Sequence, residues 1–266
     1  MGSLSYGGLS ISLWLLLSGL SFSAQANNPQ QGMEGITLHN TRVIYPSTAT
    51  NGVNYQLTNN TSVSYLLQAQ ILPWVPATTK TEQEQKSAAT SGELPSPKAF
   101  IALPPLQRIG PGETVTLLLR LKQADLPPQD SESIAVLALT AIPAEKSEKI
   151  STTPQMVIAV QNNVKLFYRP ATLPQFDEDT INNQLQFVPT STGITVKNPS
   201  AFYITFDRLT VGSHKVDLGS ARMIAPRSEQ HWPMTLDNRP KNIEWQVVND
   251  KGGVSDKIHQ KQLPDS

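Results

Sequence analysis

The sequence contains no cysteine, so the chain has no disulfide, no thiolate metal site and no cysteine nucleophile. It also has no excess of either charge, because 21 lysines and arginines balance 21 aspartates and glutamates. A balanced chain gives no electrostatic reason to expect nucleic acid or an anionic membrane as a partner. Any charge that serves function must therefore be local.

Recognisable catalytic and cofactor motifs are missing as well. The chain has no G-x-S-x-G elbow, no G-x-x-x-x-G-K phosphate loop, no H-E-x-x-H and no G-x-G-x-x-G. The histidines at 39, 214, 231 and 259 are scattered, which favours surface or turn positions over metal ligation. The consecutive acids Asp177, Glu178 and Asp179 are typical of a solvated turn. We therefore expect no enzyme, no metal and no cofactor.

A long apolar run lies near the N-terminus, from Leu9 to Phe22, and is followed by the small-x-small pattern Ala24-Gln25-Ala26. The run is shorter than the roughly 20 apolar residues that a membrane-spanning helix needs. No lysine or arginine precedes it, which departs from the usual secretory pattern. The pattern still predicts a cleaved signal peptide over residues 1–26, hence secretion without stable membrane insertion. An uncleaved anchor is the alternative.

Short alternating runs bounded by Pro, Gly or Asn dominate the rest of the chain. Examples are Val53 to Leu57 before two asparagines, Val63 to Ile71 before a proline, and Val115 to Leu121 after Gly110-Pro111-Gly112. Alternation with a period of two indicates half-buried strands, and turn residues at this spacing favour a β-sandwich, with a closed barrel as the alternative. Residues 77–98 lack any apolar period and are expected to form a solvated loop.

A composition break at Arg169-Pro170-Ala171-Thr172-Leu173-Pro174 predicts a domain boundary, because two prolines stop the preceding strand. Short strand-like runs resume beyond it. We therefore expect two all-β domains, residues 27–170 and residues 171–266, although a chain of this length could also form one large domain.

The segment MVIAVQNNVKLFY, Met156 to Tyr168, is unusually long and apolar for a strand. Met156, Ile158 and Val160 fall on one face, and intervening apolar residues fall on the other. Such a strand is either buried on both sides or an edge that awaits a partner. From these residues alone, a central core strand is the favoured interpretation. Simple alternation places Lys165 on the opposite face from Val160.

Seven separated blocks stand out along the chain: TRVIYP (41–46), YLLQAQI (65–71), PPLQRIGPGE (104–113), NVKLFYRPA (163–171), NPSAFYITF (198–206), MIAPRS (223–228) and VNDKGG (248–253). They resemble the signature blocks of periplasmic pilus chaperones of the PapD-like family and occur in the family's order, and the match spans about residues 35 to 253. The resemblance implies two immunoglobulin-like β-sandwich domains set at an angle, with a subunit-binding cleft between them.

The resemblance also implies residue roles. Met156, Ile158 and Val160 would belong to a donor strand that completes the open groove of a pilus subunit, which reverses the core-strand interpretation. Arg42 and Lys165 would anchor the carboxylate of the subunit. Glu132, Arg169 and Asp250 would form an interdomain ion-pair network. This chain has Ser131 where the family usually has an arginine, and that departure leaves the geometry around Glu132 open.

The implied function is that of a periplasmic chaperone that binds, folds and caps pilus or fimbrial subunits by donor-strand complementation and delivers them to an outer-membrane usher. No cofactor and no nucleic acid are expected. A short connection from Pro143 to Pro154 resembles the short-loop subclass. The alternatives are a secreted immunoglobulin-like structural subunit or adhesin, for which residues 27–34 lack the alternating extension, and a secreted hydrolase, for which no nucleophile and base are recognisable.

Overall fold

A computed structural model describes residue 2 and residues 35–75, 99–122, 126–144, 158–235 and 240–263. The chain divides into a unit of residues 1–33 and a compact unit of residues 34–266. All the strands and the helix described below belong to the second unit. Within the described residues, no helix is both long enough and apolar enough to cross a membrane.

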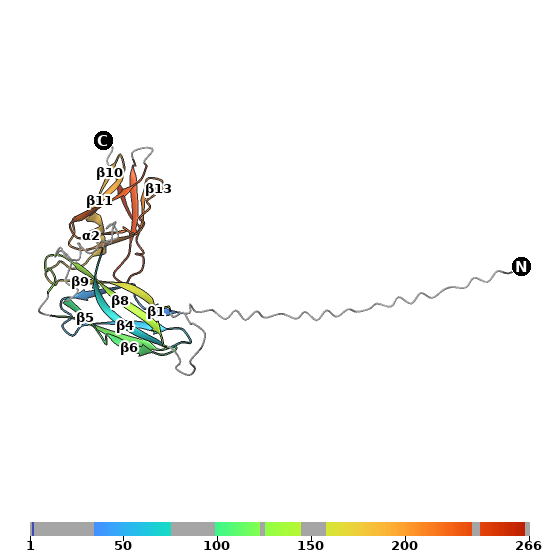
Figure 1. The fold of residues 1–266 in the computed structure, drawn as a ribbon. Coiled ribbons are helices and arrows are strands. Elements are labelled where there is room, and N and C mark those ends of the chain that lie inside the picture. The colour runs from blue at the N-terminus through green and yellow to red at the C-terminus, as the bar shows by residue number, and fades with distance from the viewer. Residues whose placement is uncertain are drawn as a thin grey trace. The chain divides into compact units, whose positions relative to one another are not determined.

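The first half of the compact unit contains two sheets. One has the strand order β1-β3-β7-β5 and the other has the order β2-β9-β8-β4-β6, in which β2 and β9 are parallel. Figure 1 labels strands of both sheets, β1 and β5 of the first and β4, β6, β8 and β9 of the second. The strands are β1 (Ile36–Leu38), β2 (Arg42–Pro46), β3 (Val53–Asn59), β4 (Tyr65–Pro73), β5 (Phe100–Leu103), β6 (Leu106–Ile109), β7 (Thr114–Leu121), β8 (Ser133–Pro143) and β9 (Val160–Arg169).

The alternating side chains seen in the sequence form the core between these sheets. Tyr55 and Leu57 of β3, Leu67 of β4 and Leu117 and Leu119 of β7 are all at most 2% exposed. The β7 run follows a turn in which Gly112 has a positive φ of 69°, a conformation that glycine adopts without steric cost. Period-two alternation therefore fixes which face of each strand is buried.

The second half contains a separate core and two further sheets. Their orders are β10-β11-β15 and β13-β12-β16-β17, with β14 also paired to β12. The strands are β10 (Gln186–Thr190), β11 (Gly193–Asn198), β12 (Ile204–Val211), β13 (His214–Lys215), β14 (Met223–Ile224), β15 (Ser228–Pro233), β16 (Asn242–Val247) and β17 (His259–Gln262). Two distinct cores confirm the expectation of two all-β sandwich domains and exclude a single large domain.

One helix interrupts this all-β architecture, and its position corrects the expectation of a solvated turn at residues 177–179. Helix α2 spans Glu178–Gln184, and the Asp177 carboxylate caps it by accepting a hydrogen bond from the backbone N–H of Thr180 at 3.0 Å. Glu178 and Asp179 occupy the first turn, where acidic side chains favour helix formation. The acids thus start a helix, which the turn interpretation missed.

His259 is a second correction, because it is 4% exposed rather than on the surface or in a turn. Its ring stacks on the buried Trp245 with ring centroids 5.4 Å apart. Burial lowers the pKa of His259, since a charged imidazolium is disfavoured away from water. The other three histidines are exposed, as expected.

Candidate functional site

Arg42 and Lys165 lie side by side on two paired strands. Arg42 is the first residue of β2, and the register of the parallel β2–β9 pair places it directly opposite Lys165. Val43 of β2 and Val164 and Leu166 of β9 belong to the core of the first sandwich. The two cations therefore lie on the outer face of that sheet, opposite the core.

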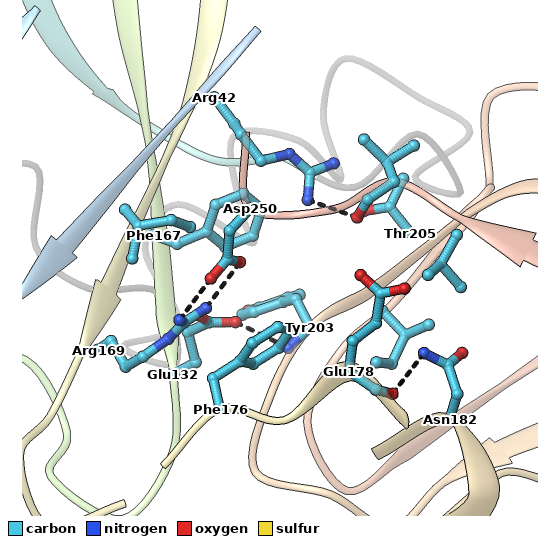
Figure 2. A pocket seen from close by; sticks show the side chains of 14 residues that line it. Arg42, Glu132, Phe167, Arg169, Phe176, Glu178, Asn182, Tyr203, Thr205 and Asp250 are labelled. Carbon is cyan, nitrogen blue, oxygen red and sulfur yellow. Dashed lines mark hydrogen bonds and ion pairs between the residues drawn. The ribbon is translucent and has the colours of Figure 1, made fainter. Parts of the chain in front are cut away.

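Arg42 is largely buried, at 9% exposure. Its Nη1 donates to the backbone carbonyl of Val248, in the second sandwich, at 3.2 Å (Figure 2), and its guanidinium carbon lies 5.4 Å from the ring centroid of Phe167. Desolvation by burial lowers its pKa, but an arginine side chain still stays protonated at neutral pH. Arg42 is thus a fixed, partly dehydrated positive charge.

Lys165 is half-buried, and its Nζ lies 4.9 Å from the ring centroid of Trp74. Burial, followed by repulsion from Arg42 and Arg222, lowers the pKa of Lys165 to about 8. Within the described ranges, neither Lys165 nor Arg42 forms a salt bridge with a carboxylate. Two adjacent cations that form no salt bridge among the described residues are suited to bind an anion from outside the chain.

Arg169 brings together the three residues expected to form an ion-pair network. Its Nη2 lies 2.9 Å from Glu132 Oε1 and its Nη1 lies 2.7 Å from Asp250 Oδ2 (Figure 2). The other Glu132 oxygen accepts from the backbone N–H of Tyr203 at 2.9 Å. Glu132 directly precedes β8 and Arg169 ends β9, whereas Tyr203 and Asp250 belong to the second half, so this network joins the two sandwiches.

The network lines a pocket of about 360 Å³, counting its opening to solvent. Arg42 and Phe167 of the first sandwich and Thr205 and Val248 of the second also line it (Figure 2). Burial raises the pKa of Glu132, although the charge of Arg169 and the hydrogen bond from Tyr203 oppose that rise. A buried carboxylate of this kind depends on its cationic partner.

A second ion pair between the sandwiches lies next to Ser131 and joins Asp130 to Arg227. Arg227 donates from Nη1 to Asp130 Oδ2 at 2.6 Å and from Nη2 to the Asp130 backbone carbonyl at 2.8 Å. Arg227 has a positive φ of 51°, which is uncommon for a residue other than glycine. Sequence reasoning missed this pair, because no local pattern links two residues 97 positions apart.

The N-terminal part of β9 is an exposed, half-open edge. Ile158 is 62% exposed and Val160 is 55% exposed. β8 pairs with β9 from Val160 onward, whereas β2 pairs with β9 only from Lys165 onward. No described strand therefore pairs with residues 160–164 on the side where β2 lies. The interpretation of Ile158 and Val160 as part of a central core strand is wrong, because both side chains are in water. Met156 lies outside the described residues.

The described residues thus form two β-sandwiches, with an adjacent cation pair and a stretch of β9 that no described strand covers on its β2 side. An exposed sheet edge of this kind is one that another polypeptide can join by strand addition. The chain belongs to the PapD family of pilus-assembly chaperones. Residues 35–174 match the family described as "Pili and flagellar-assembly chaperone, PapD N-terminal domain", and residues 180–259 match "Pili assembly chaperone PapD, C-terminal domain". This family is not enzymatic.

Curated relatives extend over most of the chain. "Probable fimbrial chaperone SfmC" of Escherichia coli (strain K12) is 30% identical over 243 residues, which cover 91% of this chain and 94% of the relative. "Uncharacterized fimbrial chaperone YcbF" of the same strain is 27% identical over 226 residues, covering 85% of this chain and 88% of the relative. These relatives support the assembly-chaperone function over the subunit or adhesin alternative.

Solved structures share the fold. The structure described as "Salmonella enterica SafA pilin in complex with the SafB chaperone (Type I)" matches with a TM-score of 0.67 at 24% identity and covers 87% of this chain and 98% of its own. The E. coli chaperone DraB matches with a TM-score of 0.66 at 24% identity and covers 86% of this chain and 98% of its own. The short-loop subclass stays a prediction, because residues 145–157 lie outside the described residues.

Proposed function

We propose that this chain binds pilus subunits by adding its β9 strand to the open edge of a subunit. The observation that carries the proposal is a pair of exposed aliphatic side chains, Val160 at the start of β9 and Ile158 two residues before it. The β2 side of β9 is unpaired among the described strands up to residue 164. A strand added at that edge would satisfy backbone hydrogen bonds on both chains. Each buried aliphatic side chain would contribute about 1.5–3 kcal/mol.

The carboxylate of the subunit is the proposed ligand of Arg42 and Lys165. Val160 shares a face with Val164 and Leu166, so the donor side chains continue the core face, while Lys165 lies on the outer face of the same strand. A chain terminus fixed at Lys165 sets the register of the added strand. Register matters because a slip of one residue turns every side chain to the wrong face.

The remaining steps rest on the family. We infer that residues 1–26 are a signal peptide removed on export to the periplasm, that residues 27–170 and 171–266 are the two domains, and that the loaded chaperone delivers its subunit to an outer-membrane usher. The Glu132–Arg169–Asp250 network would keep the two sandwiches in the arrangement that presents the anchor. We propose the short-loop subclass as well.

Replacing Lys165 tests the anchor most directly. In Lys165→Met, capture of co-produced pilus subunits is expected to fall by about ten- to a hundredfold, because one charge-assisted contact is lost. Lys197→Met is a matched control, since Lys197 is 51% exposed and pairs with Glu229 in the second sandwich. Co-purification from the periplasm, followed by mass spectrometry, measures capture. Equal capture by Lys165→Met and wild type would show the anchor assignment to be wrong.

Arg42→Ala is expected to abolish capture, but it is a less selective test than Lys165→Met. Arg42 also bonds Val248 across the two sandwiches, so its loss changes the contact between them. A melting temperature measured beside the capture assay separates loss of the anchor from loss of the fold.

Capture should also depend on pH. The pKa of Lys165 in the free protein is about 8, and a bound carboxylate raises it. Above pH 8 most free protein therefore has a neutral Lys165, which must take up a proton when the carboxylate binds. The affinity is expected to fall about tenfold between pH 7 and pH 9. Lys165→Arg keeps its charge and should bind with a flat profile over this range. A flat wild-type profile would rule out Lys165 as the titrating anchor.

A further inference from the structure

A row of four side chains crosses the outer face of the sheet that carries the proposed anchor. Arg42 is opposite Lys165, Lys165 is opposite Val136 of β8, and Val136 is opposite Leu72 of β4. Trp74 lies two positions beyond Leu72, directly after the end of β4 at Pro73. The indole of Trp74 therefore reaches back across β8 to the Lys165 ammonium, which lies 4.9 Å from its centroid.

Both anchor cations contact aromatic rings, and they differ from Arg169 in having no salt bridge with a carboxylate among the described residues. The Arg42 guanidinium lies 5.4 Å from the Phe167 centroid, and Lys165 contacts Trp74. Arg169 also contacts aromatic rings, but two carboxylates neutralise it. The face of an aromatic ring attracts a cation through its quadrupole and carries no net charge. A ring can thus hold an ammonium in place without cancelling the charge that an incoming anion needs.

Lysine gains more from such a support than arginine does. Its ammonium ends a flexible four-carbon stem, and ordering that stem costs conformational entropy when an anion binds. Arg42 is already held by the Val248 carbonyl. No hydrogen bond holds the Lys165 ammonium within the described part of the chain, which leaves the Trp74 ring as its contact there.

We propose that Trp74 is a positioning residue of the carboxylate anchor, holding the Lys165 ammonium beside Arg42 with its charge unpaired. The inference rests on the proposed function, since it assigns a role within the same site. Trp74 acts through Lys165 and not by contact with a distant part of the subunit. Its loss therefore matters for a ligand with a free carboxylate and not for the same ligand without one.

The test uses the full-length chain purified from the periplasm and two small probes. N-acetylvaline carries a free carboxylate, and N-acetylvalinamide is its uncharged control. Binding is followed through the NMR resonances of the Lys165 side chain in wild type, Trp74→Phe, Trp74→Leu and the control Gln70→Leu. Gln70 is exposed on the same face of β4. Thermal melting checks that each variant is folded.

We expect Trp74→Leu to weaken N-acetylvaline binding roughly three- to tenfold, and Trp74→Phe to restore most of that loss, because phenylalanine also presents an aromatic face. Gln70→Leu should bind N-acetylvaline with the affinity of wild type. For N-acetylvalinamide, the Trp74 variants should not differ from wild type. In a Lys165→Met background, Trp74→Leu should have no further effect on the affinity for N-acetylvaline. Binding to Lys165→Met is followed through Trp74 fluorescence, and binding to the double variant is followed by calorimetry.

Three outcomes overturn the inference. If folded Trp74→Leu binds N-acetylvaline with the affinity of wild type, Trp74 does not contribute to the anchor. An equal loss with Lys165 present or absent would show that Trp74 acts independently of Lys165. If N-acetylvaline fails to shift the Lys165 resonances of wild type, the carboxylate anchor itself is wrong, and the role of Trp74 falls with it.

Discussion

Arg169→Met is expected to lower the free energy of unfolding by about 3–5 kcal/mol, because it leaves a buried carboxylate without its cation. The side chain of Glu132 is only 2% exposed, and Arg169 is its sole salt-bridge partner within the described ranges. The substitution also removes the bidentate contact of Arg169 with Asp250 and its stacking against Phe176 and Phe202. Urea denaturation of wild type and variant at pH 7 measures the difference.

Arg227→Met provides a matched control, because it also removes one arginine that joins the two sandwiches. The side chains of Arg227 and Asp130 are 56% and 68% exposed, so solvent screens their attraction and the expected loss is below about 1 kcal/mol. Equal effects of the two substitutions would show that burial does not set the strength of the Arg169 network.

The pH dependence of Arg169→Met gives a second check. Burial already raises the pKa of Glu132, and removal of Arg169 raises it further. A group with a raised pKa binds its proton more tightly in the folded state, so the destabilisation should be largest at neutral pH and shrink as Glu132 becomes protonated in acid. Glu132→Gln, introduced into Arg169→Met, should recover much of the lost stability at pH 7. A loss that is independent of pH would contradict this explanation.

Ile158→Asp is expected to abolish subunit binding and to leave the free protein folded. Ile158 is 62% exposed, so an aspartate at this position stays hydrated in the free chain. In the proposed complex the same carboxylate would enter an apolar groove, which costs several kcal/mol and corresponds to at least about a hundredfold loss of affinity. Co-purification with pilus subunits and thermal melting of the free variant measure the two effects.

Gln161→Asp is the control for Ile158→Asp. Gln161 is exposed on the opposite face of β9, where its side chain bonds Asn163 at 2.9 Å. An aspartate there remains in water whether or not a subunit is added, so binding should change little. The donor-strand proposal fails if Ile158→Asp melts like an unfolded chain without any partner, or if both variants bind subunits equally well.

The alternating runs of the sequence determined the all-β class and the two cores. Tyr55, Leu57, Leu117 and Leu119 are buried where period-two alternation places them, because successive side chains on a strand point to opposite faces. The TRVIYP and NVKLFY blocks were enough to single out Arg42 and Lys165 through the resemblance to a family. Local pattern therefore carried both the fold and the position of the candidate anchor.

Local pattern failed where a residue's environment depends on distant parts of the chain. The apolar run around Ile158 and Val160 favours a core strand by composition, and only the tertiary structure shows that β2 begins too late to cover its edge. The stacking of His259 on Trp245 likewise depends on a neighbour that the sequence does not place nearby, whereas Asp177 caps α2 through the nearby Thr180, a local signal that the turn interpretation missed.

The geometry of the contacts between the sandwiches was decided by the tertiary structure, although the resemblance had already pointed to Glu132, Arg169 and Asp250. Arg169 meets Asp250 across 81 positions and Arg227 meets Asp130 across 97. Within the first sandwich, Trp74 reaches across β8 to Lys165. Strand periodicity specifies which face a side chain occupies, because sterics and backbone pairing are local. It does not specify which side chains meet across two packed domains, because their meeting depends on how the completed sheets pack. The charge balance of the binding site depends on these contacts between domains.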